Sequence, residues 1–159
     1  MSVAFTKESD FEAAAANLPD RPISPHPNLV TPEGLAQIEA ELAKARAAYA
    51  EAQAEGGVQA DRTAIARATR DLRYYTARRA SAQLVEPVPN SPTLVFGGRV
   101  TFEREDGRRQ TYRIVGEDEA DPANGSVSYV SPLAKALLGK GVGETAIING
   151  QEVEIVEVR

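Results

Sequence analysis

The sequence predicts an α+β protein in which an antiparallel α-helical coiled-coil hairpin precedes a small antiparallel sheet domain with one short helix. Residues 31–85 are rich in alanine, arginine and glutamate, and their apolar positions recur at alternating spacings of three and four. Residues 93–159 instead alternate apolar and polar side chains between turn sequences, as strands do. The proline-containing segment 86–92 separates the two patterns, so we place a linker there.

The first helix is expected to begin at Thr31-Pro32-Glu33, where a hydroxyl cap, a proline and an acid stand in the order that helix starts favour. Residues 1–30 contain four prolines and are expected to form a tail or strap, with a short helix near residues 8–17. The apolar seam of the first arm comprises Leu35, Ile38, Leu42, Ala45, Tyr49 and Ala52. The seam of the second arm comprises Ile65, Ala68, Leu72, Tyr75, Arg79 and Ala82. Gly56-Gly57 interrupts the pattern, which predicts a turn that makes the arms antiparallel.

The second domain is expected to consist of two hairpins, an isolated strand and a helix. The expected strands are residues 93–102, 110–115, 126–130, 145–148 and 152–158. Ser131-Pro132 is typical of a helix start, which predicts a short helix over residues 133–138. Asn149-Gly150 is the preferred pair of a type I′ hairpin turn. The acidic segment 117–121 lacks calcium-loop spacing and is expected to be a solvated turn.

Composition narrows the possible functions. The 159 residues, 42% of them hydrophobic, suffice for one domain or two small ones. Cysteine is absent and His26 is the only histidine, so neither a disulfide framework nor a zinc site is expected. The net charge of −5 argues against a dedicated duplex-DNA binder. No long apolar run and no secretory signal are found, so we expect a cytoplasmic monomer without a membrane span.

Several ordered motifs of the second domain resemble one known family. These motifs are residues 95–97, 100–101, 110–121, 131–140 and 143–144. They are similar to the bacterial Gre transcription elongation factors, GreA and GreB. The resemblance also covers the hairpin in outline.

The resemblance implies an FKBP-like second domain that grips the rim of the secondary channel of RNA polymerase, while the hairpin enters the channel. It also implies that Ser131, Pro132 and Leu133 belong to the polymerase-binding surface. In such factors two carboxylates at the hairpin tip help to hold a magnesium ion, and the polymerase then hydrolyses its own backtracked RNA. The protein would need no cofactor of its own, the magnesium would be held by the polymerase, and transcript RNA would be an indirect partner.

The hairpin tip departs from the family pattern. The expected motif of Gly-Asp, two residues, Glu-Asn-Ala, an acid and Tyr is missing, and alignment from both ends makes the hairpin shorter by one heptad, or about 10 Å, in each arm. Candidate replacements for the tip carboxylates are Glu51, Glu55 and Asp61. The alternative is a solvated helix end at which Asp61 caps the second helix.

The second arm is rich in arginine. Arg67, Arg70 and Arg73 are candidate contacts for nucleic acid or an acidic polymerase surface. The simpler interpretation pairs the arginines of this arm with the glutamates of the first arm, each pair contributing little.

The sequence is therefore compatible with three functions. The first is a Gre-type regulator that binds polymerase at the secondary channel and modulates elongation or competes with cleavage factors. The second is an active cleavage factor that uses the tip acids, with the active site still belonging to the polymerase. The third is a prolyl isomerase, which rests only on an FKBP-like fold and is disfavoured by the 6% aromatic content.

Overall fold

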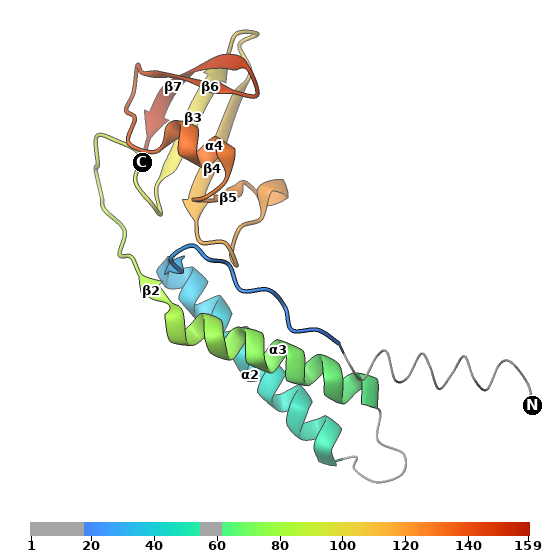
Figure 1. Ribbon diagram of the computed structural model, residues 1–159. Coiled ribbons are helices and arrows are strands. Elements are labelled where there is room, and N and C mark those ends of the chain that lie inside the picture. Colours follow the sequence, from blue (N-terminus) through green and yellow to red (C-terminus); the bar gives the residue numbers. More distant parts are fainter. Residues whose placement is uncertain (1–17, 55–61) are drawn as a thin grey trace, which may run out of the picture. The chain divides into compact units, whose positions relative to one another are not determined.

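The computed structural model describes residues 18–54 and 62–159, which belong to two compact units (Figure 1). One unit holds residues 18–25 and most of the helical hairpin, from Gln37 to Ser81. The other unit holds His26–Ala36 and Ala82–Arg159. It therefore includes the sheet and the first helical turn of the first hairpin arm. Of the helices in these ranges, none combines the length and the apolar character that crossing a membrane requires.

The hairpin arms are α2, Pro32–Ala54, and α3, Arg62–Ser81. The predicted seam of α2 is confirmed, because Ile38, Leu42, Ala45 and Ala52 are buried. At about 1.5 Å per residue, the 23 residues of α2 extend about 34 Å. The predicted turn at Gly56-Gly57 lies outside the described residues.

The last part of the α3 seam was predicted wrongly. Ala68 is buried as expected, but Arg79 is exposed and its neighbour Arg78 is 2% exposed. Arg79 is charged and its Nε lies 3.0 Å from a carboxylate oxygen of Glu39 in α2, so its side chain stays exposed in an ion pair instead of packing in the seam.

Residues 18–25, here called the N-terminal strap, lie along α3. The guanidinium of Arg21 sits 3.8 Å from the ring centroid of Tyr74, and its Nη1 is 3.6 Å from a carboxylate oxygen of Asp71. Asp20 accepts a hydrogen bond of 3.2 Å from Arg73. These contacts combine a cation–π interaction with exposed ion pairs. The predicted helix near residues 8–17 lies outside the described residues.

The sheet unit contains a five-stranded sheet with the order β5-β4-β3-β7-β6. Its strands are β3 (Arg99–Arg104), β4 (Arg109–Val115), β5 (Ser126–Ser128), β6 (Thr145–Ile148) and β7 (Gln151–Val158). A separate pair joins β1 (Leu29–Val30) to β2 (Gln83–Leu84) in parallel. The predicted type I′ turn is confirmed by the positive φ angles of 52° at Asn149 and 77° at Gly150.

Two expectations about the sheet are corrected. The sheet is not wholly antiparallel, because β4 and β5 are parallel. The connection between them includes the 3₁₀ helix η1 (Pro122–Asn124), and it brings Ser126 back beside Arg113, so that β5 runs parallel to the last three residues of β4. The first strand begins at Arg99 rather than Thr93, because Gly97 adopts a φ of 85° that interrupts an extended conformation.

The hydrophobic core lies between one face of the sheet and α4, Pro132–Leu137. Phe102, Ile114, Leu137 and Ile155 are completely buried in it. The opposite sheet face carries charged and polar side chains, among them the ion pair between Glu103 and Arg109 at 3.0 Å. The core therefore fixes α4 firmly to the sheet, which matters for the residues at its start.

Candidate functional site

The start of α4 displays the segment that the resemblance assigns to polymerase binding. Ser131 has extended backbone angles, φ −65° and ψ 152°, and its Oγ accepts a hydrogen bond of 3.2 Å from the N–H of Ala134. The serine is thus a helix cap, a role that alone explains its presence. Pro132 occupies the first helical position and is exposed, whereas Leu133 is half-buried and packs against the core. Of the three predicted residues, Pro132 is the one most available to a partner.

The turn that leads into α4 is held by several hydrogen bonds. The N–H of Ser131 donates to the carbonyl of Ser128 at 3.0 Å, and the N–H of Val130 donates to the Ser128 hydroxyl at 3.2 Å. The ring of Tyr129 packs edge-on against Phe96, with centroids 5.7 Å apart, and its hydroxyl donates to the carbonyl of Pro27. The exposed Pro132 is therefore presented on a preorganised backbone, which lowers the entropic cost of binding.

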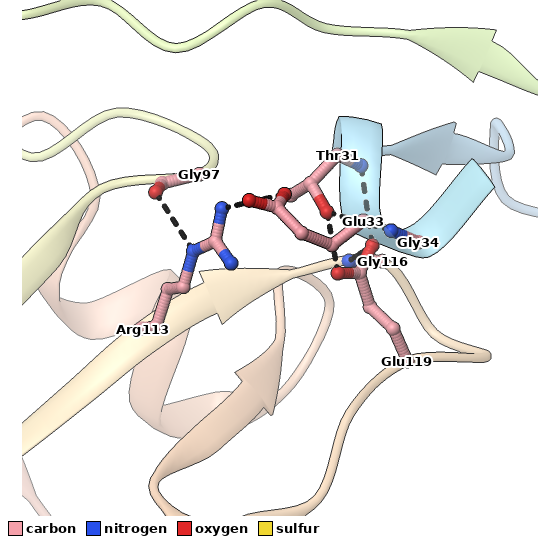
Figure 2. Close-up of polar contacts among 7 residues, drawn as sticks. All are labelled: Thr31, Glu33, Gly34, Gly97, Arg113, Gly116 and Glu119. Carbon is pink, nitrogen blue, oxygen red and sulfur yellow. Dashed lines mark hydrogen bonds and ion pairs between the residues drawn. The ribbon is translucent and has the colours of Figure 1, made fainter. Parts of the chain in front are cut away.

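A carboxylate clamp joins the first turn of α2 to the loop after β4, and all of its residues belong to the sheet unit (Figure 2). Glu119 accepts hydrogen bonds from the Thr31 N–H at 3.1 Å and the Thr31 hydroxyl at 2.6 Å. The same carboxylate lies 3.4 Å from the N–H of Gly116. The Thr31 hydroxyl in turn accepts from the N–H of Gly34 at 3.0 Å, so the predicted helix cap is confirmed.

Glu119 was not expected to have this role. Its segment, residues 117–121, was predicted to be a solvated turn, but Glu119 reaches Thr31, which is only 1% exposed. Gly34 makes this approach possible, since a Cβ at that position would overlap the Glu119 carboxylate. Glu119 and Thr31 are 88 residues apart in the chain, so no local spacing signals their contact.

An ion pair between Arg113 and Glu33 reinforces the same region (Figure 2). The guanidinium of Arg113 donates to Glu33 at 3.2 Å and to the carbonyl of Gly97 at 3.2 Å. The pKa of Glu33 is lowered from its ordinary value, first by a hydrogen bond from its own backbone N–H and then by Arg113. Both effects favour the charged carboxylate.

We expect Glu33 to titrate below the ordinary glutamate pKa of about 4.3. Because the pKa of Glu33 is lower in the folded chain than in the unfolded chain, the interactions of its carboxylate stabilise the folded chain at pH values above the unfolded pKa. This contribution is lost as the pH falls through the folded pKa. NMR titration of the Glu33 carboxyl carbon measures the pKa of this group in the folded chain. Arg113→Gln should move the midpoint of Glu33 upward, while Arg109→Gln, which removes the partner of Glu103 instead, should leave it unchanged. An unchanged midpoint in Arg113→Gln would contradict the assignment of that ion pair.

The three candidate arginines of α3 differ in their surroundings. Arg73 is bound to Asp20 of the strap, Arg70 lies 3.8 Å from its neighbour Asp71, and Arg67 is exposed. Arg70 and Arg73 also line a shallow groove of about 300 Å³ beside Leu18. The predicted pairing between the two arms is seen at Arg79 and Glu39, whose charged atoms are 3.0 Å apart. Arg73, which was a candidate contact for a partner or for the first arm, is therefore paired with Asp20 of the strap.

Of the three candidate tip acids, only Glu51 is among the described residues. Glu51 is exposed near the end of α2, whereas Glu55 and Asp61 lie outside the described residues. Within residues 18–54 and 62–159, no group of three or more histidine, aspartate or glutamate side chains is placed to hold a metal ion.

Comparison with known proteins gives a consistent result. Residues 89–159 match the family described as "Transcription elongation factor, GreA/GreB, C-term". The chain is 36% identical over 152 residues to transcription elongation factor GreA of Psychrobacter, an alignment covering 81% of this chain and 95% of the relative. It is 36% identical over 135 residues to GreB of Pseudomonas aeruginosa, covering 76% of this chain and 80% of that protein.

A third relative, GreB of Neisseria meningitidis, is 38% identical over 95 residues, and that alignment spans 56% of this chain and 58% of the relative. The two longer alignments extend well beyond the second domain into the helical hairpin. They agree with the ordered motifs and with the architecture of a helical hairpin and a curled sheet. The chain belongs to the GreA/GreB family of transcription elongation factors.

Proposed function

We propose that this chain binds RNA polymerase at its secondary channel, and that it modulates elongation or competes with cleavage factors without contributing cleavage carboxylates of its own. The polymerase-binding part rests on the start of α4. There a capped, core-anchored helix presents the exposed Pro132 beside the half-buried Leu133. An exposed, apolar and rigid group on a fixed backbone is the kind of feature that anchors protein interfaces.

The regulatory part rests on the sequence of the hairpin tip. The family motif with its acidic pair is replaced there by a segment that contains Glu51, Glu55 and Asp61 at different spacings. A magnesium ligand must lie about 2 Å from the ion, so a shift of one heptad would remove a carboxylate from coordination distance. A chain that binds the channel without this pair would block authentic cleavage factors by occupying their site.

The decisive experiment adds the purified protein to backtracked elongation complexes with magnesium and follows RNA length on a gel. The expected result is no shortening of the RNA, together with reduced cleavage by an added authentic Gre factor. Rapid shortening would contradict the proposal and favour an active cleavage factor. In that case Glu51→Ala, Glu55→Ala and Asp61→Ala would identify the acids responsible, with Glu41→Ala in α2 as a control.

The prolyl isomerase alternative receives no support from the packing of the aromatic side chains. Phe102 is completely buried and stacks on Tyr112 with ring centroids 6.1 Å apart, while Phe96 and Tyr129 pack on each other. These rings serve the core and the turn before α4. We expect no activity in a peptide isomerisation assay.

A further inference from the structure

The two edges of the five-stranded sheet differ in how they are protected. The edge at β5 is partly covered, because Asp121 and Ser126 exchange backbone hydrogen bonds of 3.0 and 3.1 Å. The edge at β6 pairs only with β7 among the strands of the sheet. An open edge presents backbone N–H and C=O groups to which another chain can pair.

The register of the β6–β7 hairpin identifies the backbone groups that point outward. Its two-residue turn makes Ile148 and Gln151 the closing hydrogen-bonded pair. Hydrogen-bonded and non-hydrogen-bonded pairs alternate along an antiparallel ladder. Ala146 therefore bonds to β7, and the N–H and C=O groups of Thr145 and Ile147 face away from the sheet. Within the described ranges, no backbone hydrogen bond from another segment reaches these groups.

The side chains of this edge carry none of the usual protection against pairing. Natural sheets guard exposed edges with lysine, proline or a bulge, but β6 reads Thr-Ala-Ile-Ile. Ile147 is 69% exposed, and Val142, three residues before the strand, is 64% exposed. These are the two most exposed large hydrophobic side chains in the described part of the chain. Ile147 belongs to the open strand itself, so a strand that paired with β6 would cover it.

The sheet face beside this edge is acidic. Ile147 lies opposite Glu152 and Thr145 lies opposite Glu154, and cross-strand partners share a face. Together with Glu103 and Glu105, these two glutamates line a groove of about 290 Å³ that contains one basic residue, Arg104. Within residues 18–54 and 62–159, Glu152 and Glu154 take part in no ion pair, whereas Glu103 is paired with Arg109. The groove therefore retains negative charge for a partner.

We propose that the open edge of β6 is a docking surface for an extended, basic segment of another protein, which adds to the sheet as a further strand next to β6. Backbone bonds to Thr145 and Ile147 would provide affinity. Lysine or arginine side chains at every second position of the segment would lie on the face of Ile147, where their charged ends would reach Glu152 and Glu154 and their aliphatic stems would cover Ile147. This surface is distinct from the start of α4, so the proposal stands independently of polymerase binding.

The test uses the full chain and a fluorescein-labelled peptide of alternating lysine and valine, with an alternating glutamate and valine peptide as the charge control. Fluorescence anisotropy should show salt-sensitive binding of the lysine peptide and none of the glutamate peptide. In ¹H–¹⁵N spectra the shift changes should concentrate in residues 142–154, and the Ile147 amide should become protected from exchange. Shifts spread over all acidic surfaces would overturn the proposal.

Two variants separate strand addition from general charge attraction. Ile147→Pro removes the outward N–H without removing a bond to β7, and it should weaken peptide binding about tenfold. Ile147→Val retains the donor and should bind as the unaltered chain does. If Ile147→Pro binds equally well while its spectrum shows a folded sheet, the contact is not strand addition and the proposal fails. Self-association through β6, seen by sedimentation as a dimer that the peptide does not dissociate, would also overturn it.

Discussion

Replacing Pro132 by glutamate should weaken binding of the chain to RNA polymerase by about tenfold or more, without unfolding the sheet unit. Pro132 is exposed at the first position of α4, so the substitution places a charge within the proposed interface. A buried, unpaired charge opposes association by more than 1.4 kcal/mol, the free energy that corresponds to a factor of ten. An acid at the first turn of a helix is favourable for the helix itself, so the fold should tolerate the change.

Pro122→Glu provides a matched control. Pro122 is also exposed and also occupies the first position of a helix in the same unit, the 3₁₀ helix η1. Binding would be measured by competition between the chain and a labelled authentic Gre factor for polymerase. Pro122→Glu should compete like the unaltered chain, whereas Pro132→Glu should not. Equal competition by both variants would remove the start of α4 from the binding surface.

Ser131 and Leu133 are poorer choices for this test, although the resemblance gives them the same role as Pro132. Ser131 caps α4 and Leu133 packs on the core, so substitutions there would change stability as well as binding. Loss of a helix cap alone costs about 1 kcal/mol. The structure thus divides the predicted segment into two residues that position the surface and one that is free to contact a partner.

Local sequence patterns predicted those features of the fold that local interactions determine. The Thr31 cap, the buried seam of α2 and the Asn149-Gly150 turn each depend on residues within a few positions of one another. The start of α4 at Ser131-Pro132 was equally predictable from its cap. The two caps and the turn each satisfy a local backbone requirement, whereas the seam follows from the helical spacing of apolar side chains.

Features that depend on distant pairings could not be predicted in this way. The contact between Glu119 and Thr31 joins residues 88 positions apart, and an acidic loop looks the same whether it is solvated or clamped. The parallel direction of β5 follows from the path of a connection, not from the composition of the strand. Likewise, a strand pattern alone does not reveal that β6 forms an edge, so its exposed Ile147 could not be distinguished from a buried one.

Gly116→Ala should destabilise the sheet unit by about 2–3 kcal/mol, the cost expected when a close-packed contact is overfilled. A Cβ at Gly116 would overlap the backbone carbonyl oxygen of Leu29 in β1. Backbone cannot rotate aside as the end of a flexible side chain can, so β1 must move. Movement of β1 would also disturb the clamp, since Gly116 and Thr31 both contact the Glu119 carboxylate.

Chemical denaturation of the full chain measures the loss of stability, and amide exchange at Leu29, Val30 and Thr31 locates it. Gly107→Ala is the control, because no atom lies within 4 Å of a Cβ there and only its positive φ of 86° opposes the change. That strain should cost about 1 kcal/mol and should leave exchange at β1 unaltered. If the two variants behave alike, the close approach of β1 to Gly116 does not hold the segment in place. Faster exchange confined to residues 29–31 in Gly116→Ala would instead establish that β1 is anchored through this contact, because the remaining strands keep their partners in both variants.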